Sequence, residues 1–99
     1  MAAYSVWPNE PLEGPIRLDL VFVMPRPTKR DGRKHKHAFR YPHAIKPDLD
    51  NLIKSVVDAL TGLLWRDDKQ IFSVTASKHV ASAVEQPHVI VKAEEAMKQ

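Results

Sequence analysis

The stretch KPDLDNLIK, residues 46–54, organises this 99-residue chain. Within seven residues it places the carboxylates of Asp48 and Asp50, the amide of Asn51 and the ammonium of Lys54. The proline before Asp48 restricts its own predecessor to extended conformations and suits a chain that is about to enter a helix. We therefore expect an extended approach at Asp48 and a helix with Asp50 at or near its N-cap. Lys54 follows Asp50 by four residues and shares its helix face.

A helix of about three turns is predicted to follow, from Asp50 to Thr61. Its apolar residues recur with helical spacing, and Gly62 fits the position just after a helix end. Two further carboxylates, Asp67 and Asp68, come next. Hard cations such as Mg²⁺ prefer oxygen ligands and accept a few carboxylates together with water. The sequence therefore predicts one metal-dependent site that cleaves phosphodiesters. The apolar helix positions are Leu52, Ile53, Val56, Val57 and Leu60.

Each acidic group also has a plainer interpretation. An Asp-x-Asp-Asn at a helix start is more often a simple capping cluster, and Asp-Asp in a loop is more often a solvated turn. The combination of both groups with Lys54 and an intervening helix favours a functional site.

The stretches KPDLDNLIK (46–54), DAL (58–60), Gly62 and LWRDDKQI (64–71) resemble the RusA family of Holliday junction resolvases, which is common in phages and prophages. The resemblance covers residues 14–92 and implies a homodimeric, Mg²⁺-dependent endodeoxyribonuclease, with Mn²⁺ as a substitute metal. Such an enzyme cuts four-way DNA junctions by symmetric paired nicks. The resemblance also implies a chain that is short at its N-terminus. It places the metal ligands on Asp48, Asp50 and Asp68 and the essential lysine on Lys54. Asn51 and Asp67 are our own candidates for groups that support these ligands.

A long basic connection is predicted between residues 25 and 47. Residues 26–46 carry eight Lys or Arg and one acidic residue, whereas the rest of the chain carries seven basic and eleven acidic residues. Such a concentration of positive charge favours contact with a polyanion. Phe39 and Tyr41 interleave with it as candidate base-stacking groups. The alternative is a solvated basic loop anchored by its aromatics. The candidate DNA-binding residues are Lys29, Arg30, Arg33, Lys34, Lys36, Arg40 and Lys46.

The cysteine count, the histidine spacing and the lengths of the apolar runs exclude or disfavour several classes of protein. The chain has no cysteine, which excludes disulfides and thiolate metal sites. His35 and His37 form a His-x-His pair with no third ligand fixed by spacing, so a zinc site is disfavoured. No apolar run approaches the ~20 residues that a membrane span needs, and a bacterial-type cytoplasm is the default expectation. Two rival functions remain: a catalytically silent DNA-binding remnant, and a metal-dependent phosphoesterase for small nucleotides.

The fold class follows from the periodicity. Residues 16–24 alternate as a strand, and further strands are expected at 70–79 and 88–93, before a polar tail at 94–99. Leu63, Leu64 and Trp65 are expected to form an apolar lid over the helix end. The order strand, long loop, helix, strand, strand predicts one α+β domain over residues 1–99, with a small mixed sheet against one main helix. We expect the second strand to bring Asp68 back to Asp48 and Asp50.

Overall fold

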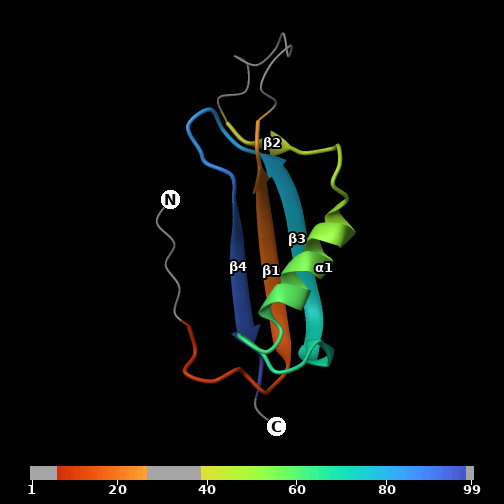
Figure 1. The fold of residues 1–99 in the computed structure, drawn as a ribbon, viewed down its shortest axis with the longest axis vertical. Coiled ribbons are helices and arrows are strands. Elements are labelled where there is room, and N and C mark those ends of the chain that lie inside the picture. The colour runs from red at the N-terminus through yellow and green to blue at the C-terminus, as the bar shows by residue number, and fades with distance from the viewer. Residues whose placement is uncertain (1–6, 27–38, 98–99) are drawn as a thin grey trace.

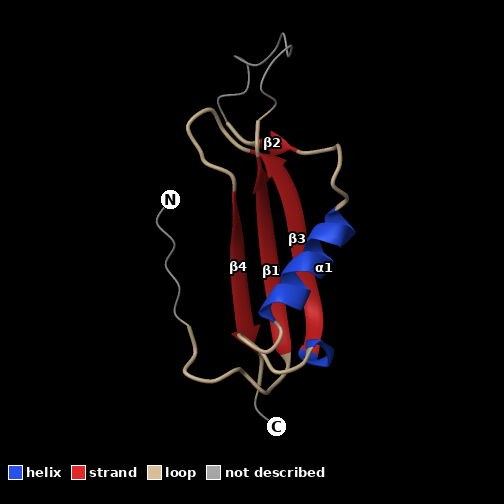
Figure 2. Ribbon diagram, viewed as in Figure 1, coloured by secondary structure: helices blue, strands red, loops and turns tan. Residues whose placement is uncertain are grey.

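The computed structural model describes residues 7–26 and 39–97. Its elements are β1 (Ile16–Met24), β2 (Tyr41–Pro42), α1 (Leu49–Leu60), the short 3₁₀ helix η2 (Asp68–Gln70), β3 (Ile71–Val80) and β4 (His88–Glu95). The strands form one mixed sheet in the order β2-β3-β1-β4, and α1 covers one of its faces (Figure 1; Figure 2). The predicted α+β class, with a mixed sheet and one main helix, is confirmed.

The pairing of the strands explains the position of the helix. β1 and β3 are parallel neighbours, whereas β4 pairs with β1 and β2 pairs with β3 in antiparallel fashion. Parallel strands need a crossover, and the segment containing α1 supplies it. β3 therefore begins beside Ile16, where β1 also begins, and both strands run towards the same end of the sheet.

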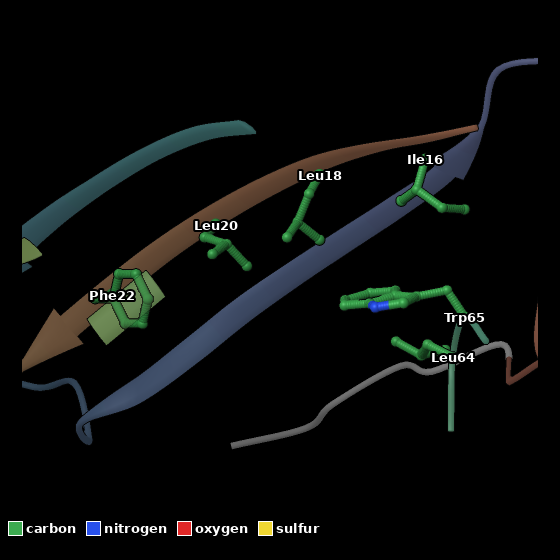
Figure 3. Close-up of a cluster of buried hydrophobic side chains, with 6 residues drawn as sticks. All are labelled: Ile16, Leu18, Leu20, Phe22, Leu64 and Trp65. Carbon is green, nitrogen blue, oxygen red and sulfur yellow. The ribbon is translucent and has the colours of Figure 1, made fainter. Parts of the chain in front are cut away.

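The hydrophobic core lies on one face of β1, which is covered by the apolar side of α1 and by the segment that follows α1. Four alternating side chains of β1 point to one face and pack with Leu64 and Trp65 (Figure 3). The indole N–H of Trp65 donates to Thr61 Oγ1 at 2.8 Å, so the buried ring keeps a polar partner. Leu64 and Trp65 thus belong to the core as predicted, but Leu63 is 58% exposed, so the predicted lid is only partly correct. The four β1 residues are Ile16, Leu18, Leu20 and Phe22.

Three boundaries can be compared with the sequence prediction. The region expected to be a continuous loop contains β2, which is only two residues long and carries no periodicity. β4 runs on to Glu95, because Glu94 and Glu95 pair with Arg17 and Ile16 on β1, so the expected polar tail begins later. Gly62 follows the helix at φ +94°, the left-handed conformation predicted for that position.

Candidate metal and nucleic-acid site

The first acidic group lies at the N-terminal end of α1. Asp48 is the N-cap residue, with extended angles of φ −67° and ψ 146°, and its carboxylate makes no capping hydrogen bond. Asp50 lies in the first helical turn, and its Oδ1 accepts a hydrogen bond from the N–H of Asn51 at 3.0 Å. Asp50 is therefore near the N-cap, as predicted, and Asp48 is itself the cap, because the chain enters the helix at Leu49. Both carboxylates are exposed at the positive end of the helix, where anionic groups are favoured.

Lys54 lies one turn further along the same helix. It is exposed, as are Asn51 and Asp58. Asp58 lies one turn further along the helix, and no ion pair joins it to Lys54 in the described part of the chain. The Lys54 ammonium is therefore accessible to an external anion beside Asp50.

Lys78, which was not predicted as a site residue, binds the backbone of the segment that leads to Asp48. Lys78 Nζ donates to the carbonyl oxygens of Ile45 and Pro47, at 2.5 and 2.6 Å. Its own carbonyl accepts from the N–H of His43 at 3.2 Å. We call the two Nζ contacts the Lys78 bridge. The sequence pattern offers one indication of this contact. In the alternation of β3, Lys78 stands on the same face of the sheet as Ala76 and Val80, where an apolar residue is expected.

The second acidic group lies in the 3₁₀ helix η2. Asp67 is its N-cap, and its Oδ1 accepts from the N–H of Lys69 at 3.0 Å. This backbone hydrogen bond is the main reason that the pKa of Asp67 is lowered. Asp67 therefore has a structural role in capping the turn, and Asp68 follows it with an exposed side chain. The predicted support of a metal ligand by Asp67 stays a prediction.

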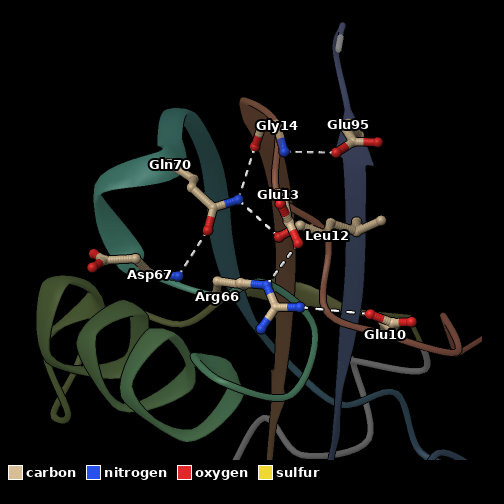
Figure 4. A network of polar contacts seen from close by, with 8 residues as sticks. All are labelled: Glu10, Leu12, Glu13, Gly14, Arg66, Asp67, Gln70 and Glu95. Carbon is tan, nitrogen blue, oxygen red and sulfur yellow. Dashed lines mark hydrogen bonds and ion pairs between the residues drawn. The ribbon is translucent and has the colours of Figure 1, made fainter. Parts of the chain in front are cut away.

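Gln70 fastens this turn to the start of β1 (Figure 4). Its Oε1 accepts from the N–H of Asp67 at 2.7 Å, and its Nε2 donates to the carbonyls of Leu12 and Gly14, each at 2.9 Å. Gln70 was not predicted as part of the site, although Asp67 and Gln70 have the spacing of a capping box.

A second set of contacts holds the same corner of the molecule. Arg66 reaches Glu13 Oε2 at 2.9 Å and Glu10 Oε1 at 3.6 Å. The N–H of Gly14 donates to Glu95 Oε2 at 2.6 Å. A Cβ at Gly14 would lie 2.6 Å from the carbonyl oxygen of Met97, so a larger residue does not fit without movement. Together with Gln70, these contacts hold the turn that carries Asp68 against both β1 and β4.

The two acidic groups lie at opposite ends of α1 and β3 (Figure 1). A helix of 12 residues is about 18 Å long at a rise of about 1.5 Å per residue. Along β3, the distance from Ile71, next to η2, to Lys78, next to Pro47, is about 23 Å at about 3.3 Å per residue. Among residues 7–26 and 39–97, no three His, Asp or Glu side chains are grouped to hold a metal ion.

The expected return of Asp68 to Asp48 and Asp50 within one chain is therefore not met. The reason is topological: β3 is parallel to β1, so it starts at the end of the sheet where α1 finishes rather than where α1 begins. Their assignment as metal ligands remains a prediction.

Most of the predicted DNA-binding residues, Lys29, Arg30, Arg33, Lys34 and Lys36, lie outside the described residues, as do His35 and His37 of the disfavoured zinc site. Lys46 is exposed next to the first acidic group. Arg40 instead pairs with Glu85, with contacts of 2.9 and 2.6 Å to Glu85 Oε2. This pairing raises the pKa of Arg40 and is the main cause that lowers the pKa of Glu85 to about 2. Arg40 therefore has an internal partner in Glu85, and its predicted contact with DNA stays a prediction.

His43 is the buried polar residue of this region, 9% exposed, and its Nδ1 has no hydrogen-bond partner in the described part of the chain. Burial lowers its pKa, and the nearby charge of Lys78 lowers it further. The imidazole is thus kept neutral, five residues before Asp48 in the chain.

Comparison with known proteins assigns the chain to a family. The sequence model of one family, Endodeoxyribonuclease RusA, matches residues 1–94. The chain belongs to the RusA family. A relative from Bacillus subtilis (strain 168), named "Uncharacterized protein YqaN", is 33% identical over 89 residues, which are 85% of this chain and 60% of that protein. The chain thus spans about three fifths of the length of this relative, and no solved structure matches it.

The RusA family is one of endodeoxyribonucleases, enzymes that act on DNA. Within the described ranges, no helix of this RusA-family chain is both long and apolar enough to cross a membrane.

Proposed function

We propose that this protein is a Mg²⁺-dependent endodeoxyribonuclease that cuts four-way DNA junctions by symmetric paired nicks. The observation that carries the proposal is the exposed Asp48–Asp50 pair at the start of α1, with Lys54 one turn later, in a chain of the RusA family. The two carboxylates are oxygen ligands of the kind that Mg²⁺ prefers, and the amide of Asn51 next to Asp50 is placed to support them. When bound, the metal supplies a Lewis acid and a water of lowered pKa.

The residues of the chain have distinct roles in this reaction. Asp48, Asp50 and Asp68 would hold the metal. Lys54 directs its positive charge at the phosphate, where it either stabilises the developing negative oxygens or orients the attacking water. Lys46 and the basic residues between 29 and 36 contact the DNA backbone, which gives an affinity that falls steeply with salt.

We infer further that the metal site is completed by a second copy of the chain. In a single chain Asp68 lies at the opposite end of α1 and β3 from Asp48 and Asp50, a span of about 18 Å along the helix and about 23 Å along the strand. A two-fold axis near the middle of α1 and β3 exchanges the two ends, and this brings Asp68 of the partner subunit to the Asp48–Asp50 pair. The same operation creates two equivalent sites, which suits a junction with near-equivalent strands.

The surface beside α1 and β3 supports this arrangement. No residue of α1 is fully buried, and Val74 on the same face of the sheet is 42% exposed. β2 pairs with β3 only at Val80 and His79, so residues 71–77 have no neighbouring strand on that edge among the described elements. That stretch carries no charge, whereas the opposite edge strand, β4, carries Lys92, Glu94 and Glu95, which discourage strand pairing.

Complementation between inactive variants tests both parts of the proposal. One variant carries Asp48→Asn with Asp50→Asn, and the other carries Asp68→Asn; each alone should fail to nick a synthetic four-way junction in Mg²⁺. In a mixed population about half of the dimers combine one chain of each kind, and each such dimer holds one intact site. We therefore expect about a quarter of the wild-type sites to be recovered, as single nicks.

The control is Asp58→Asn, an exposed aspartate of α1 outside the site, which should cut as the wild type does. If the wild-type protein does not cut a junction in Mg²⁺, the proposed activity is wrong. If it cuts but the mixed variants stay inactive after subunit exchange, the shared site is wrong.

A further inference from the structure

We propose that Lys78 is a positioning residue of this nuclease site, which it serves by fixing the backbone that presents Asp48. The proposal rests on the proposed function, since it concerns the same site, but it adds a residue that neither the family resemblance nor the sequence pattern assigns. Lys78 belongs to β3 and reaches across to a segment 31–33 positions earlier in the chain.

The geometry of the Lys78 bridge is specific to that segment. One ammonium group holds two carbonyls two residues apart, Ile45 O at 2.5 Å and Pro47 O at 2.6 Å. Pro47 directly precedes Asp48, so the second contact fixes the peptide unit that joins them. An ammonium group donates up to three hydrogen bonds, and its positive charge makes each of them stronger. It therefore links a rigid strand effectively to an irregular segment.

The segment has little else to fix it. All five residues from 44 to 48 are exposed, with Ile45 at 68%, so the segment buries little apolar surface. The side chain of Asp48 makes no capping hydrogen bond that would orient it. Just before this segment, the backbone N–H of His43 donates to Lys78 O at 3.2 Å. Lys78 thus holds the approach to Asp48 against β3 through both its side chain and its backbone.

The role of Lys78 differs from that of a core residue. The hydrophobic cluster formed by β1, Leu64 and Trp65 does not include it. Removal of the ammonium should therefore leave the fold largely intact while the backbone of residues 44–50 gains freedom. A displacement of about 1 Å at a catalytic group can cost about 100-fold in rate, so the consequence for activity is large compared with that for stability.

The test uses the full chain with three substitutions. Lys78→Met removes the donors and keeps an unbranched side chain only one atom shorter, and Lys78→Arg keeps a charged donor. Lys92→Met is the control, because Lys92 is an exposed lysine on β4. The first readout is the set of backbone amide resonances in the absence of metal. We expect Lys78→Met to shift or broaden residues 44–51 while β1 and β4 keep their wild-type resonances, and Lys92→Met to leave residues 44–51 unchanged.

The second readout is metal-dependent nicking of a four-way junction. We expect Lys78→Met to lower kcat by about 10- to 100-fold and to raise the half-saturating Mg²⁺ concentration, without a change in junction affinity measured without metal. Lys78→Arg should recover a substantial part of both. Wild-type resonances for residues 44–51 in Lys78→Met would overturn the proposal whether or not the protein is a nuclease. If the wild type nicks junctions and Lys78→Met has the same Mg²⁺ dependence, the proposed role of Lys78 is also wrong. If the wild type does not nick junctions, the proposed function is wrong instead.

Discussion

Replacement of Gln70 by glutamate probes how the turn that carries Asp68 is held. The glutamine accepts one hydrogen bond, from the N–H of Asp67, and donates two, to the carbonyls of Leu12 and Gly14. Gln70→Glu keeps an acceptor for Asp67 but loses both donors, and it sets a negative oxygen against two carbonyl oxygens. The substitution leaves the side-chain volume almost unchanged, so its effect on stability reports the polar interactions alone.

The expected magnitude follows from the two hydrogen bonds that Gln70→Glu removes. Each hydrogen bond contributes about 1 kcal/mol net, and a part-buried carbonyl left without a donor adds to the cost, so we expect a loss of about 2–4 kcal/mol in the free energy of unfolding. Even the lower figure of about 2 kcal/mol lowers Tm by roughly 8–16 °C in a domain of this size. The side chain of Lys69 in the same turn is exposed, and Lys69→Ala should change stability by less than about 0.5 kcal/mol.

Urea unfolding at pH 7 measures the effect as a lower midpoint with an unchanged m-value. A second titration near pH 4, where the introduced carboxyl is partly protonated and regains a donor, should show a smaller difference from wild type. If Gln70→Glu unfolds within about 0.5 kcal/mol of wild type at pH 7, the turn is held by other contacts and the reasoning fails.

Two pH dependences are also expected. Because burial lowers the pKa of His43 in the folded state, the unfolded chain takes up a proton more readily, and stability should fall as pH drops below about 6.5. His43→Leu should flatten the unfolding free energy between pH 7 and 5; an unchanged slope would contradict this. Glu85 has its folded pKa lowered to about 2, chiefly by Arg40, so its contribution is present above about pH 4.5 and is lost towards pH 2. The stability difference between wild type and Glu85→Gln should shrink over that range, and a constant difference would show that the pair does not titrate as expected.

The sequence by itself determined the elements that depend on local pattern. The alternation of residues 16–24 predicted β1 with its observed bounds, because a strand with one buried face must place apolar residues at every second position. The apolar spacing after Asp50 predicted α1 to within a residue, and Gly62 marked its end. The acidic groups were also visible in the sequence, since the residue types that suit a hard cation stand in two short stretches.

Only the tertiary structure decided how these stretches lie relative to one another. The parallel pairing of β3 with β1 places Asp68 at the far end of α1 from Asp48, and no local pattern encodes which strands pair. The same holds for Lys78 and Arg40, whose partners lie more than 30 residues away along the chain. Periodicity reports which face of an element is buried, whereas contacts between distant segments depend on the packing of the whole sheet, and that packing leaves the acidic groups of one chain about a helix length apart.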